Sequence, residues 1–302
     1  MAQSTKRMER DPVGDPADSP FGWWEKGTLG ILGVFTAAAV LGYGIFALHP
    51  QFLPEAGFGL TLYTVSFGLF ARLHIALAAV AMAIVLTLRL GLRWVPAFVA
   101  VYALSFLAEH VGTGFGFPFG GYEYTALLGP KLLGRVPWLI PVSWFLMALP
   151  AWLIARRTLV RRQDALARVA VGSLWLVAWD LALDPAMSAL TPYWVWEEPG
   201  PYYGMPWINL LGWYVTGLAL LTAIEFSSRS VRFESVDFRW TVGYYAAMLL
   251  MPLGMLLAAG EWLAVAATAL GLAACRAATV WADGRSRVPD GERAPDGLGV
   301  RA

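Results

Sequence analysis

The chain has 302 residues, of which 58% are apolar and only 14% are charged, and its formal net charge is +1. Soluble domains carry about 25% charged residues, so this composition excludes an ordinary soluble domain and indicates a polytopic membrane protein. The nearly neutral charge gives no sign of a nucleic-acid partner. The single cysteine, Cys275, lies in an apolar run and cannot form an internal disulfide.

Apolar segments of about 20 residues, the length that crosses a bilayer, recur along the chain. They predict an all-α fold of eight transmembrane helices, near Thr28–Leu48, Leu60–Leu88, Trp94–Ala108, Trp138–Ala155, Val169–Leu190, Trp207–Ile224, Trp240–Ala259 and Trp262–Trp281. These helices form a single transmembrane domain over residues 28–282. The flanking segments, residues 1–27 and 283–302, are rich in charge, proline and glycine and are expected to be disordered cytoplasmic tails.

Lysine and arginine gather in the tails and in every second loop. The loops after the second, fourth and sixth helices hold Arg89, Arg93, Arg156, Arg157, Arg161, Arg162, Arg168, Arg229, Arg232 and Arg239. Apart from Lys131 and Arg135, the intervening loops are nearly free of basic residues. Because cytoplasmic loops carry the excess of basic residues, we expect both termini in the cytoplasm, and helical spans favour the inner membrane.

Ionisable residues interrupt two of the apolar segments toward the opposite, outer side. Glu109 and His110 are expected to end the third helix, and Asp180 and Asp184 lie four residues apart in the fifth. Residues at i and i+4 share a helix face, so both aspartates are expected to face the bundle interior. Pro185 leaves a carbonyl one turn earlier without its usual donor and is expected to kink the helix beside the second aspartate.

These features also have structural interpretations. Arg72, in the middle of the second helix, could neutralise an aspartate, Asp180 in particular. Trp194 and Trp196 are best interpreted as part of an aromatic belt at the membrane interface. The glycine-rich run at 112–121 follows a helix, and its glycines alternate with phenylalanines. It is therefore not a dinucleotide fingerprint, and we expect a compact apolar loop.

Four motifs carry a resemblance to a known family: AEHVGTGFGFPFGGYEYT, PVSWFLM, WDLALDPAM and YYGMPWINLLGW. Over about Arg93–Trp213 the chain resembles the membrane-integral carotenoid 1,2-hydratases, the CruF-like group of carotenoid biosynthesis proteins. The resemblance implies addition of water across the terminal C1,C2 double bond of an acyclic ψ end group, as in γ-carotene, lycopene or a bacterioruberin-type precursor. It also implies that no cofactor or metal ion takes part.

The acidic residues fit this chemistry. Hydration of an unactivated alkene begins with protonation at C2, which leaves a tertiary cation at C1 for water to attack. A buried carboxyl group beside a second carboxylate can keep its proton at neutral pH. We therefore expect Asp184 to donate the proton and Asp180 to assist it or to orient water, although the two roles could be exchanged. Glu109 with His110 is expected to activate the water.

Aromatic and polar side chains near these acids are expected to bind the substrate. Trp175 and Trp179 share the aspartate helix at membrane depth, where an interfacial belt has no reason to be. Together with Tyr122 they could stabilise the cation. The further candidates for binding substrate or holding water are Tyr124, Tyr202, Tyr203, Trp207 and Asn209.

Other classes of membrane protein fit the residues less well. A di-iron desaturase needs many histidines, and only His49, His74 and His110 are present. A prenyltransferase that binds diphosphate through magnesium would need a second aspartate-rich motif. A carotenoid cyclase shares the cation but loses a proton, and a carotenoid carrier or transporter would also bury charges and rings. The prenyltransferase, the cyclase and the carrier remain alternatives. The expected partners are a carotenoid, water and membrane lipid, with other enzymes of the pathway as further candidates.

Overall fold

The computed structural model describes residues 22–287, so the tails expected at 1–21 and 288–302 lie outside the described residues. The long helices are α1 (Trp23–Gly42), α2 (Phe58–Leu90), α3 (Val95–Phe115), α4 (Leu139–Arg156), α5 (Ala165–Asp184), α6 (Trp207–Ser227), α7 (Phe238–Ala259) and α8 (Trp262–Arg287). The short helical turns are η2 (Tyr43–Ala47), η3 (Pro50–Phe52), η4 (Gly91–Trp94), η5 (Ala126–Leu128), η6 (Arg162–Asp164), η7 (Pro185–Leu190) and η8 (Phe233–Ser235). The strands are β1 (Tyr122–Tyr124), β2 (Lys131–Leu132), β3 (Val136–Pro137) and β4 (Trp194–Trp196).

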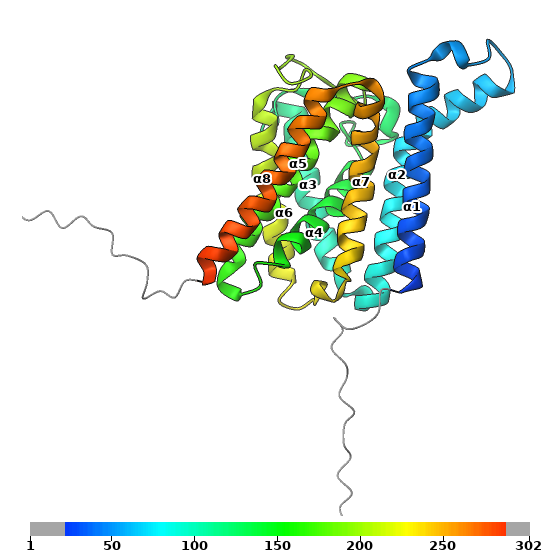
Figure 1. The fold of residues 1–302 in the computed structure, drawn as a ribbon. Coiled ribbons are helices and arrows are strands. Elements are labelled where there is room, and N and C mark those ends of the chain that lie inside the picture. The colour runs from blue at the N-terminus through cyan, green and yellow to red at the C-terminus, as the bar shows by residue number, and fades with distance from the viewer. Residues whose placement is uncertain (1–21, 288–302) are drawn as a thin grey trace, which may run out of the picture.

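Successive long helices run in opposite directions along one bundle (Figure 1). The start of α1 and the end of α8 lie at the same end, the lower one in Figure 1, as an even number of crossings requires. Seven stretches of the described chain are long and apolar enough to cross a membrane, and one of them, Gly68–Phe115, joins most of α2 to α3. The predicted all-α membrane bundle of eight helices is therefore confirmed. Helices α1 and α8 extend a few residues into the segments 22–27 and 283–287 that were expected to belong to the tails.

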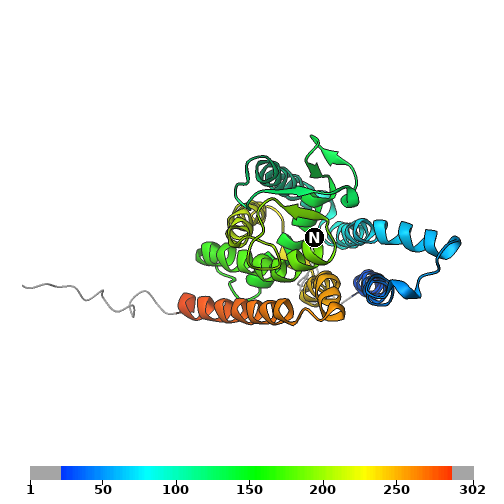
Figure 2. The ribbon, with the colours of Figure 1, turned by 90° about the horizontal axis from the view of Figure 1, so that it is seen from above.

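Helix α4 is the centre of the bundle. Nearly all of its residues are buried, Trp152 among them, and it contacts α2, α3, α5, α6 and α7. Helices α1 and α8 lie at the edge (Figure 2), where apolar side chains such as Ile31 and Leu270 remain exposed. An exposed apolar surface of this extent marks the side that faces lipid.

Helix α3 is longer than the sequence indicated and continues to Phe115. The expectation that Glu109 and His110 end this helix is therefore wrong, because both lie inside it. The hydroxyl of Thr113 donates to the carbonyl of Glu109 at 2.8 Å and so adds a hydrogen bond to the glycine-rich last turn. The helix ends at Gly116, whose φ of +72° is the left-handed conformation that glycine adopts most easily.

The chain changes its helical geometry at Pro185, as expected. Helix α5 ends at Asp184, and the π-helical turn η7 follows directly. Proline has no N–H to donate to the carbonyl of Leu181, one turn earlier. The hydroxyl of Tyr202, from the loop before α6, donates to that carbonyl instead at 2.7 Å. The freed carbonyl therefore anchors the loop that follows against α5.

Two segments far apart in sequence pair across the upper end of the bundle. Strands β1 and β4 form an antiparallel sheet in which Tyr122 pairs with Trp196, and Tyr124 pairs with Trp194. Alternate residues of a strand point to the same side, and these four rings point into the bundle while Glu123 is exposed. We call this sheet the lid and this end of the bundle the lid end (Figure 2).

Phe119, from the loop between α3 and β1, holds the lid against the helices. Its ring contacts the backbone at Gly112 of α3 and at Gly212 of α6. A Cβ atom would lie 2.8 Å from this ring at the first position and 2.7 Å from it at the second, so both contacts require glycine. The glycine-rich run expected to form a compact apolar loop thus joins two helices.

A buried ion pair joins three helices at the opposite end, which we call the basic end. Arg168 of α5 is 2% exposed and donates to both oxygens of Glu225 in α6, at 2.6 and 2.7 Å. Trp152 of α4 donates to the same carboxylate at 2.8 Å. A bidentate arginine–carboxylate contact of this kind fixes the orientation of the helices as well as their distance.

We expect Arg168→Met to lower the free energy of unfolding by about 3 kcal/mol, because it leaves the largely buried carboxylate of Glu225 without its cation. Thermal unfolding in detergent, followed by circular dichroism, measures this loss. Arg162→Met is the matched control, since Arg162 is exposed on the turn just before α5. Equal melting temperatures for the two variants would contradict the structural role of the ion pair.

Candidate active site

Asp184 lies at the end of α5, directly beneath the lid. Its carboxyl group is 1% exposed and accepts hydrogen bonds from four groups. The hydroxyl of Ser188 donates at 2.8 Å, the indole N–H groups of Trp194 and Trp196 at 3.3 Å each, and Nδ2 of Asn209 at 3.5 Å. Three of these contacts are long for hydrogen bonds, so the site holds this carboxyl group loosely.

Glu109 of α3 faces the same space and is held more tightly. It accepts hydrogen bonds from the hydroxyls of Tyr122 and Tyr124, the latter at 2.8 Å, and from Nε1 of Trp144 at 2.8 Å. Burial raises the pKa of both tyrosines well above their usual value, and the nearby charge of Glu109 raises it further. Both hydroxyls therefore stay protonated and donate hydrogen bonds to the carboxylate.

Asp180 is completely buried one turn before Asp184, and the side chain of Asn209 connects the two carboxyl groups. Nδ2 of Asn209 donates to Asp180 at 3.0 Å and also contacts Asp184, so the two aspartates share a face of α5 as predicted. The other oxygen of Asp180 has no hydrogen-bond partner within residues 22–287. Asp180 is thus linked to Asp184 through the side-chain amide of Asn209.

A cavity of about 50 Å³ lies between Asp184 and Glu109, and we call it the acid cavity. It is lined by Glu109, Phe119, Tyr122, Tyr124, Ile140, Ser143, Trp144, Leu183, Asp184, Trp194, Trp196, Asn209 and Trp213. A water molecule occupies about 30 Å³ in the liquid, so the cavity has room for one or two. Most of its lining is aromatic, and ring faces attract positive charge.

Neutral donors, rather than cations, hold these acids. In the described part of the chain no lysine or arginine forms an ion pair with Glu109, Asp180 or Asp184. Arg72, the expected alternative partner of Asp180, donates instead to the carbonyl of Gly68 on its own helix at 2.9 and 3.1 Å. The interpretation of Arg72 as a neutralising partner is therefore wrong.

Other predicted site residues lie away from the acid cavity. His110 stacks on Phe106, with ring centroids 5.6 Å apart, and does not share the cavity with Glu109. Trp175 packs edge-on against Tyr245 of α7, and its backbone carbonyl accepts a hydrogen bond from that tyrosine at 2.7 Å.

The remaining aromatic candidates lie outside the acid cavity and pack around it or at the surface of the lid end. Trp179 contacts the acid cavity's Trp213 edge-on, with ring centroids 5.7 Å apart. Tyr202 binds the carbonyl freed by the proline, and its ring packs against Tyr203 and Trp207. Trp207 is 59% exposed, so it lies at the surface of the lid end. Of the predicted residues, the structure brings together Asp180, Asp184, Glu109, Tyr122, Tyr124 and Asn209.

The sequence reasoning missed several donors. The belt interpretation of Trp194 and Trp196 is wrong, because both indole N–H groups face Asp184. Their alternation around a single valine was the signal for a strand that points both rings to one side. Trp144 and Ser188 were also missed. The serine lies one helical turn after Asp184, a spacing that sequence alone could have used.

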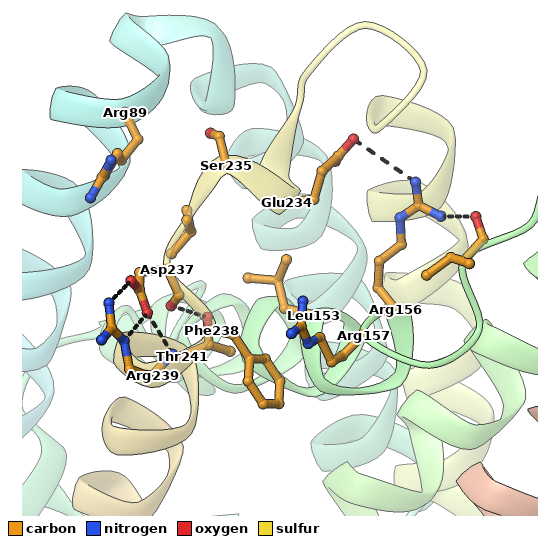
Figure 3. Close-up of a pocket in the computed structure, with 12 residues that line it drawn as sticks. Arg89, Leu153, Arg156, Arg157, Glu234, Ser235, Asp237, Phe238, Arg239 and Thr241 are labelled. Carbon is orange, nitrogen blue, oxygen red and sulfur yellow. Dashed lines mark hydrogen bonds and ion pairs between the residues drawn. The ribbon is translucent and has the colours of Figure 1, made fainter. Parts of the chain in front are cut away.

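A larger cavity of about 460 Å³ lies at the basic end (Figure 3). The arginines that line it come from three basic loops: Arg89, Arg156, Arg157 and Arg239. Arg239 pairs with Asp237 at 2.8 Å and Arg156 with Glu234 at 3.9 Å. The three basic loops thus lie at one end of the bundle, as their alternation along the chain predicted. Glu109, Asp180 and Asp184 do not line this cavity.

Comparison with known proteins places the chain in a family. The family model for carotenoid biosynthesis proteins matches residues 70–274, which is more than half of the chain. The chain belongs to the carotenoid biosynthesis protein family. The resemblance inferred from the four motifs is thereby confirmed, and the match extends beyond them to α8.

One curated relative of this family member is the bisanhydrobacterioruberin hydratase of Haloarcula japonica, which is 38% identical over 138 residues. The aligned stretch covers 43% of this chain and 44% of that relative, so it spans less than half of the relative's length. No solved structure matches the chain.

We expect Gly212→Ala to displace the lid of this family member, because the added Cβ would lie 2.7 Å from both Phe119 and the carbonyl of Pro118. Overpacking of this kind costs about 1–3 kcal/mol. Near-ultraviolet circular dichroism, which reports tryptophan packing, should change together with the melting temperature. Gly30→Ala is the control, since a Cβ at Gly30 meets nothing within 4 Å. Unchanged tryptophan signals in Gly212→Ala would argue against the lid contact.

Proposed function

We propose that this protein is a cofactor-independent carotenoid hydratase that adds water across the terminal C1,C2 double bond of an acyclic ψ end group. One observation carries the proposal. Two buried carboxyl groups, Asp184 and Glu109, have different hydrogen-bond partners and face one ring-lined cavity with room for water. The substrate is γ-carotene, lycopene or a bacterioruberin-type precursor, and the name of the Haloarcula relative favours the last.

Asp184 is the proton donor in this proposal. Its hydrogen bonds to Trp194, Trp196 and Asn209 are long, so losing or gaining a proton disturbs few close contacts. Its closest partner is the hydroxyl of Ser188, which can accept a hydrogen bond as well as donate one. When Asp184 is protonated, the Ser188 hydroxyl can still donate to one oxygen of the carboxyl group, and the proton on the second oxygen can face the alkene.

Glu109 is the base. Three close donors hold it, and all three keep their own protons, an arrangement that suits a carboxylate that receives a proton. The cavity that it shares with Asp184 contains the reacting water. His110 has no part in this step, because it does not line the cavity.

The proton balance closes within this pair of acids. Asp184 gives its proton to C2, and the electron pair of the double bond forms the new C–H bond and leaves a cation at C1. Water adds to C1 and passes one proton to Glu109. The proton then returns to Asp184 through water in the acid cavity, and both groups are restored. The net change is the addition of one water molecule to the alkene.

The aromatic lining stabilises the cation but does not suffice alone. A ring face contributes about 2 kcal/mol to a desolvated cation. Enzymes remove at least about 8 kcal/mol of barrier. The positioned acid must therefore supply much of the rest, and Asp180 helps to position it through Asn209.

A carotenoid cyclase would pass through the same cation and then lose a proton. Room for water beside Glu109 favours capture of the cation by water over cyclisation. A prenyltransferase or a carotenoid carrier needs neither a proton donor nor a base at this position.

The test is expression in hosts that make lycopene, γ-carotene or a bacterioruberin-type precursor, followed by mass analysis of the pigments. We expect a product heavier by one water. Asp184→Asn should lower its formation at least about a hundredfold, while the amount of protein in the membrane stays unchanged. Glu123→Gln is a matched control, because Glu123 points outward from the lid. An isomer of unchanged mass would identify a cyclase, and unchanged pigment with all three substrates would reject the hydratase.

Two further variants separate the roles of the acids. Glu109→Gln removes the base and should lower product formation by at least about a hundredfold. Asp180→Asn should cost less, because Asp180 does not line the acid cavity and acts through Asn209. Initial rates in isolated membranes measure both. A fully active Glu109→Gln beside an inactive Asp180→Asn would overturn the assignment of the base.

A further inference from the structure

The acid cavity is the innermost of three cavities that share walls. A second cavity of about 70 Å³, which we call the middle cavity, lies beside it. The residues that line both are Ile140, Ser143, Leu183 and Trp194. A third cavity of about 390 Å³, the outer pocket, shares Tyr193 and Met251 with the middle cavity. The three cavities therefore form a series that ends at the acids.

The outer pocket lies at the edge of the bundle. Its walls are the end of α1, the start of α2 and the face of α7, represented by Gly42, Leu62 and Met255. Figure 2 shows α1 and the start of α2 at the periphery. None of its lining residues is charged, and Phe46 and Leu62 are 36% and 53% exposed. In a bilayer this edge faces hydrocarbon rather than water.

The middle cavity continues this apolar character inward. Trp179, Met248 and Pro252 are among its lining residues. Its one imidazole, His74, has its Nε2 hydrogen-bonded to the hydroxyl of Thr36 at 3.0 Å. The series becomes acidic only in the acid cavity. A volume of about 70 Å³ admits the end of a branched hydrocarbon chain but not a whole polyene.

We propose that the polyene enters sideways from the bilayer through the outer pocket, and that its end group alone passes Tyr193 and Met251 toward the acids. This route rests on the proposed function and specifies how its substrate is held. The long chain stays in apolar surroundings throughout, which costs no exposure of apolar surface to water. The rest of the polyene remains in the outer pocket and in lipid. The protein therefore recognises the end group of the polyene rather than the length of the polyene.

Gly42 allows a direct test of the route. It lies in helical backbone, with φ −60° and ψ −41°, and a Cβ there meets nothing within 4 Å. Gly42→Trp therefore fills the outer pocket without straining the helix. We expect at least about a tenfold loss of bound polyene and of product, because a filled pocket excludes the chain. Ser66→Trp fills the same pocket from α2 and should act alike.

The matched control is Gly33→Trp. Gly33 belongs to the same helix, is also open around its Cβ position, and does not line the outer pocket. Nine residues correspond to about two and a half turns, so its side chain points to the opposite face of α1. This variant should hold and convert the polyene like the unmodified protein.

Two measurements keep the route and the chemistry apart. Pigment absorbance per purified protein reports binding, and mass analysis reports hydration. Asp184→Asn should retain the polyene without converting it. Equal retention by Gly42→Trp, Ser66→Trp and Gly33→Trp would overturn the lateral route, whatever the chemistry. Loss of the polyene from the two pocket variants alone, with no hydration by the unmodified protein, would support the route and reject the hydratase.

Discussion

The need to keep carboxyl groups inside a membrane bundle without a cationic partner governs this structure. An ionisable group at membrane depth costs about 2.5–3.5 kcal/mol on insertion scales. The protein offsets this cost with neutral donors: indole and phenol groups, an amide and a hydroxyl. These donors come from α4, α6, η7 and the lid, so the site forms only when the whole bundle has packed. An arginine beside each carboxyl group would also compensate for its burial, but it would hold that group in its charged form.

Local backbone features make the convergence of these donors possible. Pro185 ends α5 and frees a carbonyl, which Tyr202 takes up from the returning loop. Paired glycines at 112 and 212 let Phe119 enter between α3 and α6 and hold β1 in place. The pairing of β1 with β4 then aims two tyrosines at one acid and two tryptophans at the other. Each feature is small, and the acid cavity depends on all of them.

The cavities divide the two expected reactants by polarity. An apolar chain is stable in the mainly apolar outer pocket and middle cavity, whereas Glu109 and Asp184 provide hydrogen bonds for water in the acid cavity. In the proposed reaction the two meet at the wall shared by these cavities, which includes Leu183 and Trp194. In the proposal, this division keeps water away from the rest of the polyene and limits the reaction to its end. The arginine-rich cavity at the other end of the bundle takes no part in this division.

The sequence by itself determined the eight helices, their alternating direction, the common face of Asp180 and Asp184 and the break at Pro185. Each of these follows from spacing along one segment, because helical period, bilayer thickness and proline chemistry act locally. The end of α3 shows the limit of such local patterns, because the helix continues through Gly112 and Gly114 and ends only at Gly116. The tertiary structure alone decided that Trp194 and Trp196 bind an acid rather than the membrane interface. Pairing between strands some seventy residues apart depends on how the helices pack, and no local pattern encodes that.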